Sequence, residues 1–126
     1  MVVLLNGAAD LLEGRTPQEV AAALAKIVGE IRGQLPGTRV LLLGVLPLHQ
    51  SPADPLRGEI AQLNGLLANL DDGDHVRFLD IGGRFLQPDG ALSPAVMPDF
   101  VHPSLLGYQI YADAIRGTLL QMLGGS

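Results

Sequence analysis

Three short runs of the chain are almost continuously apolar, and turn residues bound each of them. The runs cover Val2–Leu5, Val40–Leu46 and Val76–Ile81. A strand that is buried on both faces of a parallel sheet has this continuous pattern, whereas a strand with one solvent-facing side alternates. We therefore predict three buried strands.

Between these runs, apolar residues recur at the three- and four-residue spacing of helices. The first helix begins at Thr16-Pro17-Gln18-Glu19, which combines a threonine cap, a proline at the first helical position and a glutamate at the third. A second helix is predicted from about Pro55 to Leu70, with an inner face formed by Leu56, Ile60, Leu63, Leu66, Leu67 and Leu70. A third is predicted from about Ser104, its cap, to Leu123, with Leu106, Ile110, Ala114 and Leu119 inward.

The resulting order is strand, helix, strand, helix, strand, loop, helix. Such alternation predicts an α/β fold with a three-stranded parallel sheet and right-handed crossovers. We expect one domain over residues 1–126. The strand Val2–Leu5 lacks a preceding partner strand, and an apolar edge strand invites pairing with another chain. This predicts a homo-oligomer or a partner chain that pairs there.

Composition excludes several classes of function. The net charge is −5 and the eight basic residues are scattered, which argues against a nucleic-acid partner. Cysteine is absent, so disulfides, thiol catalysis and thiolate metal sites are excluded. The apolar run Met1–Leu5 has no basic flank and is too short for a signal peptide or a membrane span, which favours a cytoplasmic location.

Active sites of open α/β sheets lie beyond the carboxyl ends of the strands. Asp99 and His102 fall there, on the loop before the last helix. A carboxylate that holds one imidazole nitrogen fixes the tautomer and leaves the other nitrogen to accept a proton from a nucleophile. The alternative is that Asp99 only caps a turn and that His102 is a surface residue.

Other candidates occupy the same end of the predicted sheet. Gly7, in Gly7-Ala8-Ala9-Asp10 within the loop 6–14, allows backbone N–H groups to approach an anion, or forms a plain turn. His49 could reach a pocket or be solvated, and His75 is expected on the surface. The three histidines match no metal-binding spacing, so we expect no metal.

The serines are Ser51, Ser93, Ser104 and Ser126. None follows the tight strand-to-helix glycine turn that exposes a nucleophile. Ser104 is interpreted as a helix cap, and Ser51 and Ser93 lie in loops near the candidate pocket.

An ordered series of motifs along the whole chain resembles the SGNH (GDSL-type) hydrolases, most closely the branch of the platelet-activating factor acetylhydrolase catalytic subunits. The series comprises Val2-Val3-Leu4-Leu5 with Gly7, Thr16-Pro17-Gln18-Glu19-Val20, Leu41-Leu42-Leu43-Gly44-Val45-Leu46-Pro47, Asp54-Pro55-Leu56-Arg57 with Asn64, Phe78-Leu79-Asp80-Ile81, Phe85-Leu86, Pro88-Asp89-Gly90, Leu92-Ser93, Met97-Pro98-Asp99-Phe100-Val101-His102-Pro103 and Gly107-Tyr108.

The resemblance implies a flavodoxin-like three-layer sandwich and a Ser-His-Asp triad that hydrolyses small acyl esters without a cofactor. His102 would be the acid–base residue, Asp99 its orienting carboxylate, and Gly7 part of the oxyanion pocket. Asp10, His49, Ser93 and Val101 are further candidates for a substrate pocket.

Two departures from the family pattern are visible in the sequence. The chain contains no Gly-Asp-Ser block and begins at what resembles the third strand of the family fold, so its sheet is a truncated one. Ala9 stands where the family has an oxyanion asparagine. We therefore expect a domain that is inactive alone: the C-terminal part of a longer enzyme, a degenerate relative, or one chain of an assembly that completes the sheet.

Two rival interpretations remain. The chain could be a non-catalytic binding or assembly module that pairs through Val2–Leu5, or, less favoured, an α/β domain that binds a metal ion or phosphate.

Overall fold

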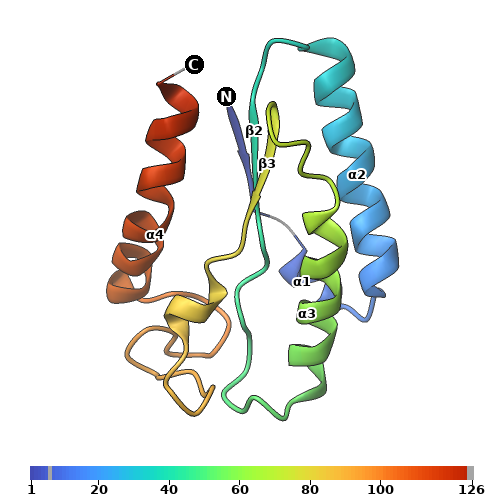
Figure 1. Cartoon of the computed structure of the whole chain (residues 1–126). Coiled ribbons are helices and arrows are strands. Elements are labelled where there is room, and N and C mark those ends of the chain that lie inside the picture. The colour runs from blue at the N-terminus through green and yellow to red at the C-terminus, as the bar shows by residue number, and fades with distance from the viewer. Residues whose placement is uncertain (6, 125–126) are drawn as a thin grey trace. The chain divides into compact units, whose positions relative to one another are not determined.

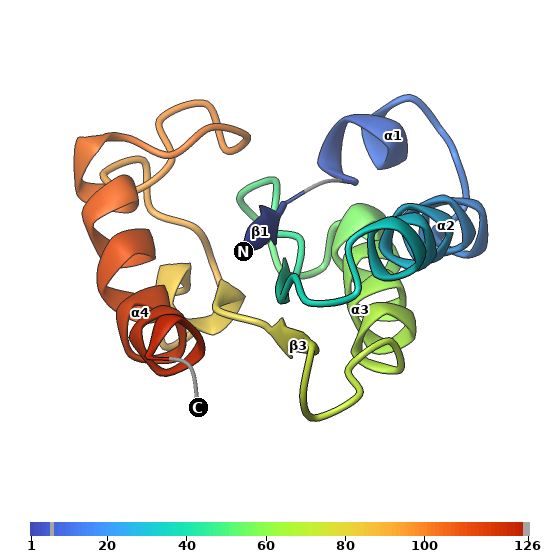
Figure 2. The same ribbon diagram turned by 90° about the horizontal axis from the view of Figure 1, so that it is seen from above.

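The strand β2 (Val40–Leu43) is buried along its whole length and forms the centre of a parallel sheet in the computed structural model, which describes residues 1–5 and 7–124. β1 (Val2–Leu4) and β3 (Val76–Leu79) flank it, and Val40 lies opposite both Val2 and Val76. The predicted parallel α/β sheet is therefore confirmed, with β1 at an edge (Figures 1 and 2).

The chain divides into two compact units. The first consists of residues 1–45 and 59–80, and the second of residues 46–58 and the chain from Ile81 onward. α3 (Pro55–Ala68) begins in the second unit and continues through the first.

The first unit contains the sheet, the short helix α1 (Ala8–Leu12) and the long helix α2 (Pro17–Gln34). α2 begins with the predicted capping box: the Thr16 hydroxyl accepts from the Glu19 N–H at 3.1 Å, and the Glu19 carboxylate accepts from the Thr16 N–H at 3.2 Å. α2 and α3 lie on the same side of the sheet (Figure 2). Val28 of α2 packs with Val40 and Val76, so the helix covers the sheet through its apolar stripe.

The side chain of Asn64 on α3 ends the sheet hydrogen bonding of the central strand. The Gly44 N–H still donates to Leu79, but the Val45 N–H donates to Asn64 Oδ1 at 2.8 Å and Asn64 Nδ2 donates to the Val45 carbonyl at 3.1 Å. The prediction that this strand reaches Leu46 is therefore wrong by three residues, because a helix side chain replaces the neighbouring strand.

The second unit contains the 3-10 helix η1 (Gly82–Phe85), the helix α4 (Leu105–Leu123) and the loops around them. Four fully or almost fully buried side chains fill its interior: Leu48, Phe85, Leu92 and Met97. η1 packs against α4, and an isolated antiparallel bridge joins Leu86 to Leu92.

Three further expectations about helices and strands need correction. The segment 6–14, expected as a loop, contains α1, although its first residue, Asn6, lies outside the described residues. The third strand ends at Leu79, because Ile81 already caps η1. The second helix ends at Ala68 rather than Leu70, although four of its predicted inner-face leucine and isoleucine residues are buried: Leu56, Ile60, Leu63 and Leu67.

The buried face of α4 differs from the predicted one at its start. Leu106, expected inward, is 48% exposed, whereas Gly107 is buried. A Cβ at Gly107 would clash with the Val96 carbonyl oxygen, so the helix approaches the loop through its glycine. That contact turns Leu106 toward solvent, while Ile110, Ala114 and Leu119 remain half-buried as expected.

Candidate active site

Asp99 organises a tight turn that ends at His102. Asp99 Oδ1 accepts hydrogen bonds from the backbone N–H groups of Val101, at 2.9 Å, and His102, at 2.7 Å. Phe100, which follows Asp99, has a φ of 59°, in the left-handed region that non-glycine residues seldom occupy. The turn therefore brings the side chains of Asp99 and His102 to the same side.

The second carboxylate oxygen of Asp99 lies 2.7 Å from His102 Nδ1. The hydrogen bond from the His102 side chain, followed by those from the backbone of His102 and Val101, holds the pKa of the Asp99 carboxyl far below its usual range. Asp99 is therefore ionised at neutral pH and can only accept. Consequently the proton of neutral His102 lies on Nδ1, and Nε2 carries the free lone pair.

The pair stands in solvent rather than in a buried cavity. The His102 side chain is 77% exposed and that of Asp99 is 56% exposed. The imidazole is thus largely open to solvent, and its orientation depends on the turn rather than on packing. The predicted pairing of Asp99 with His102 is present in the structure; the catalytic role of the pair stays a prediction.

The start of α4 anchors the chain directly after His102. The Ser104 hydroxyl accepts from the Gly107 N–H at 3.2 Å and donates to the Ala95 carbonyl at 2.6 Å, while the Ser104 N–H donates to Val96. Ser104 is therefore the helix cap that the sequence predicts.

The other two candidate serines also have local structural roles. The Ser51 hydroxyl accepts from the Ala53 N–H, and the Ser93 hydroxyl accepts from the Ala95 N–H, both at 3.1 Å. Across residues 1–5 and 7–124, no serine hydroxyl is hydrogen-bonded to the His102 ring. The described chain therefore shows no serine that His102 activates.

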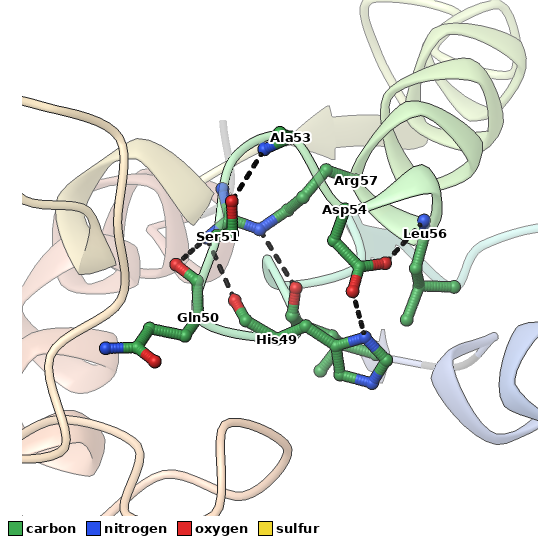
Figure 3. Close-up of polar contacts among 8 residues, drawn as sticks. His49, Gln50, Ser51, Ala53, Asp54, Leu56 and Arg57 are labelled. Carbon is green, nitrogen blue, oxygen red and sulfur yellow. Dashed lines mark hydrogen bonds and ion pairs between the residues drawn. The ribbon is translucent and has the colours of Figure 1, made fainter.

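A second histidine–aspartate pair, which the sequence did not predict, lies in the same unit. His49 Nδ1 lies 3.0 Å from Asp54 Oδ2 (Figure 3). Asp54 Oδ1 accepts from the Leu56 N–H at the start of α3, and this bond, then the one from His49, lowers the pKa of the Asp54 carboxyl. The Asp-Pro dipeptide before a helix is a capping signal that could have identified Asp54, but nothing in the spacing points to His49.

The residues expected in the oxyanion region belong to the other unit. Gly7 caps α1 with a φ of 119°, and a Cβ there would lie 3.2 Å from side-chain atoms of Val20, Val45 and Leu63, so both conformation and space require glycine. Ala9 is exposed and offers no side-chain donor. Asp10 lies 3.6 Å from Arg15 in an exposed ion pair.

The other residues singled out in the sequence lie in both units. Ser93 and Val101 are half-buried and lie in the same unit as His102. His75, expected on the surface, is 32% exposed and pairs with its neighbour Asp74 at 3.0 Å. Within the described residues, no group of three or more histidine, aspartate or glutamate side chains is arranged to hold a metal ion. None of the described helices has both the length and the apolar character needed to cross a membrane.

A family model supports the resemblance independently. Residues 1–110 match the model of the GDSL-like Lipase/Acylhydrolase family. The chain is 36% identical over 111 residues to Platelet-activating factor acetylhydrolase IB subunit alpha1 of Homo sapiens, a match that covers 87% of this chain and 48% of that protein. It is also 36% identical, over 109 residues, to the alpha2 subunit of Rattus norvegicus, with 86% and 47% covered. The chain thus spans about half the length of these relatives.

Solved structures share the fold at lower identity. A GDSL-like lipase of Bacteroides thetaiotaomicron superimposes with a TM-score of 0.81 at 21% identity, over 97% of this chain and 62% of that one. A catalytic mutant of an acetylxylan esterase from Geobacillus stearothermophilus superimposes with a TM-score of 0.64 at 24% identity, over 86% and 48% of the two chains.

Proposed function

The chain belongs to the GDSL-like lipase/acylhydrolase family, and from this premise we propose that it supplies the histidine–aspartate half of an ester hydrolase. The observation that carries the proposal is the contact of 2.7 Å between Asp99 Oδ2 and His102 Nδ1. It favours the tautomer that general-base catalysis requires, with Nε2 unprotonated, in a side chain that is largely exposed.

The proposed reaction is acyl transfer to a serine and then to water. His102 Nε2 removes the proton of the nucleophile as its oxygen attacks the ester carbonyl, and returns that proton to the departing alcohol. Water then attacks the acyl-enzyme with the same help from His102, which takes a proton from the water and gives it to the serine oxygen as the acid is released. Asp99 stays ionised throughout and stabilises the imidazolium that forms twice in each cycle.

The nucleophile is proposed to come from sequence outside these 126 residues, either a preceding segment of the same gene product or a second chain. The chain has no Gly-Asp-Ser block, and the hydroxyls of Ser51, Ser93 and Ser104 are used in turns and a helix cap. On this proposal the 126 residues are the C-terminal portion of one family domain.

The oxyanion pocket is proposed to be weaker than in an intact relative. Gly7 offers a backbone N–H, but Ala9 replaces the side-chain donor that the resemblance places at this position. One such donor contributes about 3–4 kcal/mol to the transition state, or roughly 100- to 1,000-fold in rate. Any assembled enzyme should therefore be slow unless another group takes this place.

The proposed substrate is a small acyl ester, such as an acetyl group. Relatives with this family pattern are named as acetylhydrolase subunits, and one structural neighbour is an acetylxylan esterase. The cytoplasmic location favoured by the sequence stays a prediction.

A fluorophosphonate probe, which labels activated serines, tests the half-site proposal. The purified chain, its His102→Ala variant and a His75→Ala control are treated together, with a known serine esterase as the positive control for labelling. We expect no labelling of any of the three chain variants, and no ester turnover above the His102→Ala background. Labelling of the wild type and of His75→Ala, but not of His102→Ala, would show that one of the chain's own serines is recruited and would refute the proposal.

A non-catalytic assembly role is the second candidate. β1 lies at the edge of the sheet, and three apolar side chains around it are more than 40% exposed: Met1, Val3 and Leu5. A strand of this kind can add to a strand of another chain. The relatives are themselves named as subunits, which is consistent with association.

Sedimentation of the chain at increasing concentration tests this second candidate. A dimer that Val3→Lys dissociates, and that a lysine on an exposed turn such as Asn69→Lys leaves intact, would support pairing through β1. A monomer at high concentration would count against it.

A further inference from the structure

Only two non-glycine residues in the described part of the chain have a positive φ, and a backbone hydrogen bond joins them. His49 has a φ of 66° and Phe100 a φ of 59°. The His49 N–H donates to the Phe100 carbonyl at 2.9 Å. Left-handed backbone is unfavourable for residues other than glycine, so it persists where neighbouring contacts impose it, often at functional sites.

Phe100 and Val101 lie between Asp99 and His102, and the left-handed backbone of Phe100 is part of the turn in which these two side chains meet. The Phe100 N–H donates to Met97, and its carbonyl accepts from His49. The hydrogen bond from His49 thus joins the loop before α3 to the turn of the proposed acid–base pair.

His49 is itself held on three sides. Its N–H is bonded to Phe100, its ring to Asp54, and its carbonyl accepts from Arg57 Nη2 at 3.0 Å. Figure 3 shows the Arg57 side chain reaching back from the start of α3 to the segment that carries His49.

Arg57 fixes this segment through four carbonyl groups. Its Nε donates to Leu48 at 2.9 Å, its Nη1 to Gly90 at 3.0 Å, and its Nη2 to Gln50 as well as to His49. A planar guanidinium can hold several acceptors in one fixed arrangement, which a single ammonium group cannot do. Arg57 therefore determines the path of the backbone on both sides of His49.

We propose that Arg57 is a positioning residue for the acid–base pair, because it fixes the left-handed backbone of His49, whose N–H holds the turn between Asp99 and His102. The inference rests on the proposed function of His102. The exposure of the Asp99–His102 pair gives the physical reason. Because water competes for an exposed hydrogen bond between an imidazole and a carboxylate, this bond depends on a turn that already holds the two side chains together.

The tautomer of neutral His102, read from long-range ¹H–¹⁵N spectra, tests the inference without any need for turnover. In the wild type the proton lies on Nδ1, where Asp99 accepts it, whereas a histidine free in water prefers the proton on Nε2. We expect Arg57→Gln to shift His102 from mainly Nδ1–H to mainly Nε2–H. The control Arg116→Gln removes an exposed arginine of α4, and its His102 spectrum should be the same as that of the wild type.

Two substitutions of His49 separate backbone geometry from side-chain loss. Both His49→Gly and His49→Val remove the ring that contacts Asp54, but only glycine adopts a positive φ freely. We expect His49→Gly to retain the Nδ1–H form and His49→Val to lose it, with the amide shifts of β2 used to verify that each variant is folded.

The outcomes separate this inference from the proposed function. If Asp99→Ala abolishes the Nδ1–H form while folded Arg57→Gln and His49→Val both retain it, Arg57 only stabilises the loops and the inference is overturned, but the acid–base pair stands. If Asp99→Ala itself leaves the tautomer unchanged, the proposed pair fails, and the inference fails with it.

Discussion

Replacing Asn64 with leucine should destabilise the first unit, although the two side chains are similar in size, because leucine cannot form the two hydrogen bonds of Asn64. Asn64 is 8% exposed and satisfies both the N–H and the carbonyl of Val45. Leucine matches asparagine in approximate size but can bond to neither group. Each buried backbone group that loses its partner costs about 1–3 kcal/mol, and the added apolar burial recovers part of this, so a net loss of about 2–4 kcal/mol is expected.

Urea unfolding, followed by circular dichroism, measures this loss. With a slope of about 1–3 kcal/mol per molar urea, the midpoint should fall by roughly 1–2 M. Asn69→Leu, on the exposed turn after α3, is the matched control and should change the midpoint little. An Asn64→Leu midpoint within error of the wild type would refute the reasoning, because the two bonds to Val45 would then contribute nothing net.

Gly107→Ala should lower the free energy of unfolding by about 1–3 kcal/mol, because the added Cβ meets the Val96 carbonyl. Gly117→Ala has open space around the added Cβ and should raise the free energy of unfolding by up to about 1 kcal/mol. Urea unfolding of both variants measures these changes. Thr16→Ala should cost about 1 kcal/mol through loss of the capping box, measured in the same way. Since folding lowers the pKa of Asp99, its stabilising contribution is present above the ordinary carboxyl pKa and is lost as the pH falls through the pKa of the folded state. ¹³C titration of Asp99 should therefore show a carboxylate that stays ionised well below the pH at which a carboxyl group usually titrates. A titration midpoint at the ordinary carboxyl pKa would contradict this.

Local sequence signals predicted the parts of the fold that depend on local interactions. The capping box at Thr16 and the cap at Ser104 involve partners three residues away, so their residue types suffice. The strand β2 was identifiable because burial on both faces leaves a continuous apolar run. Asp99 and His102 lie three residues apart, and one turn brings them together.

The misplaced elements depend on partners far along the chain. The end of β2 is determined by Asn64, nineteen residues beyond Val45, and nothing in the strand itself records this. The buried face of α4 is determined by the Val96 carbonyl, which only a glycine can approach. The contact of His49 with Phe100 joins two loops about fifty residues apart through backbone atoms, which leave no signature in the sequence.

The tautomer of His102 at neutral pH, compared between the wild type and Asp99→Ala, tests most directly the claim that this chain carries the acid–base half of an ester hydrolase. The account predicts the proton on Nδ1 in the wild type, with Nε2 unprotonated, and a shift to Nε2–H when the carboxylate is removed. A wild-type His102 that already carries its proton on Nε2, and that Asp99→Ala does not change, would contradict the account, because such a ring has no free nitrogen oriented to receive a proton from a nucleophile.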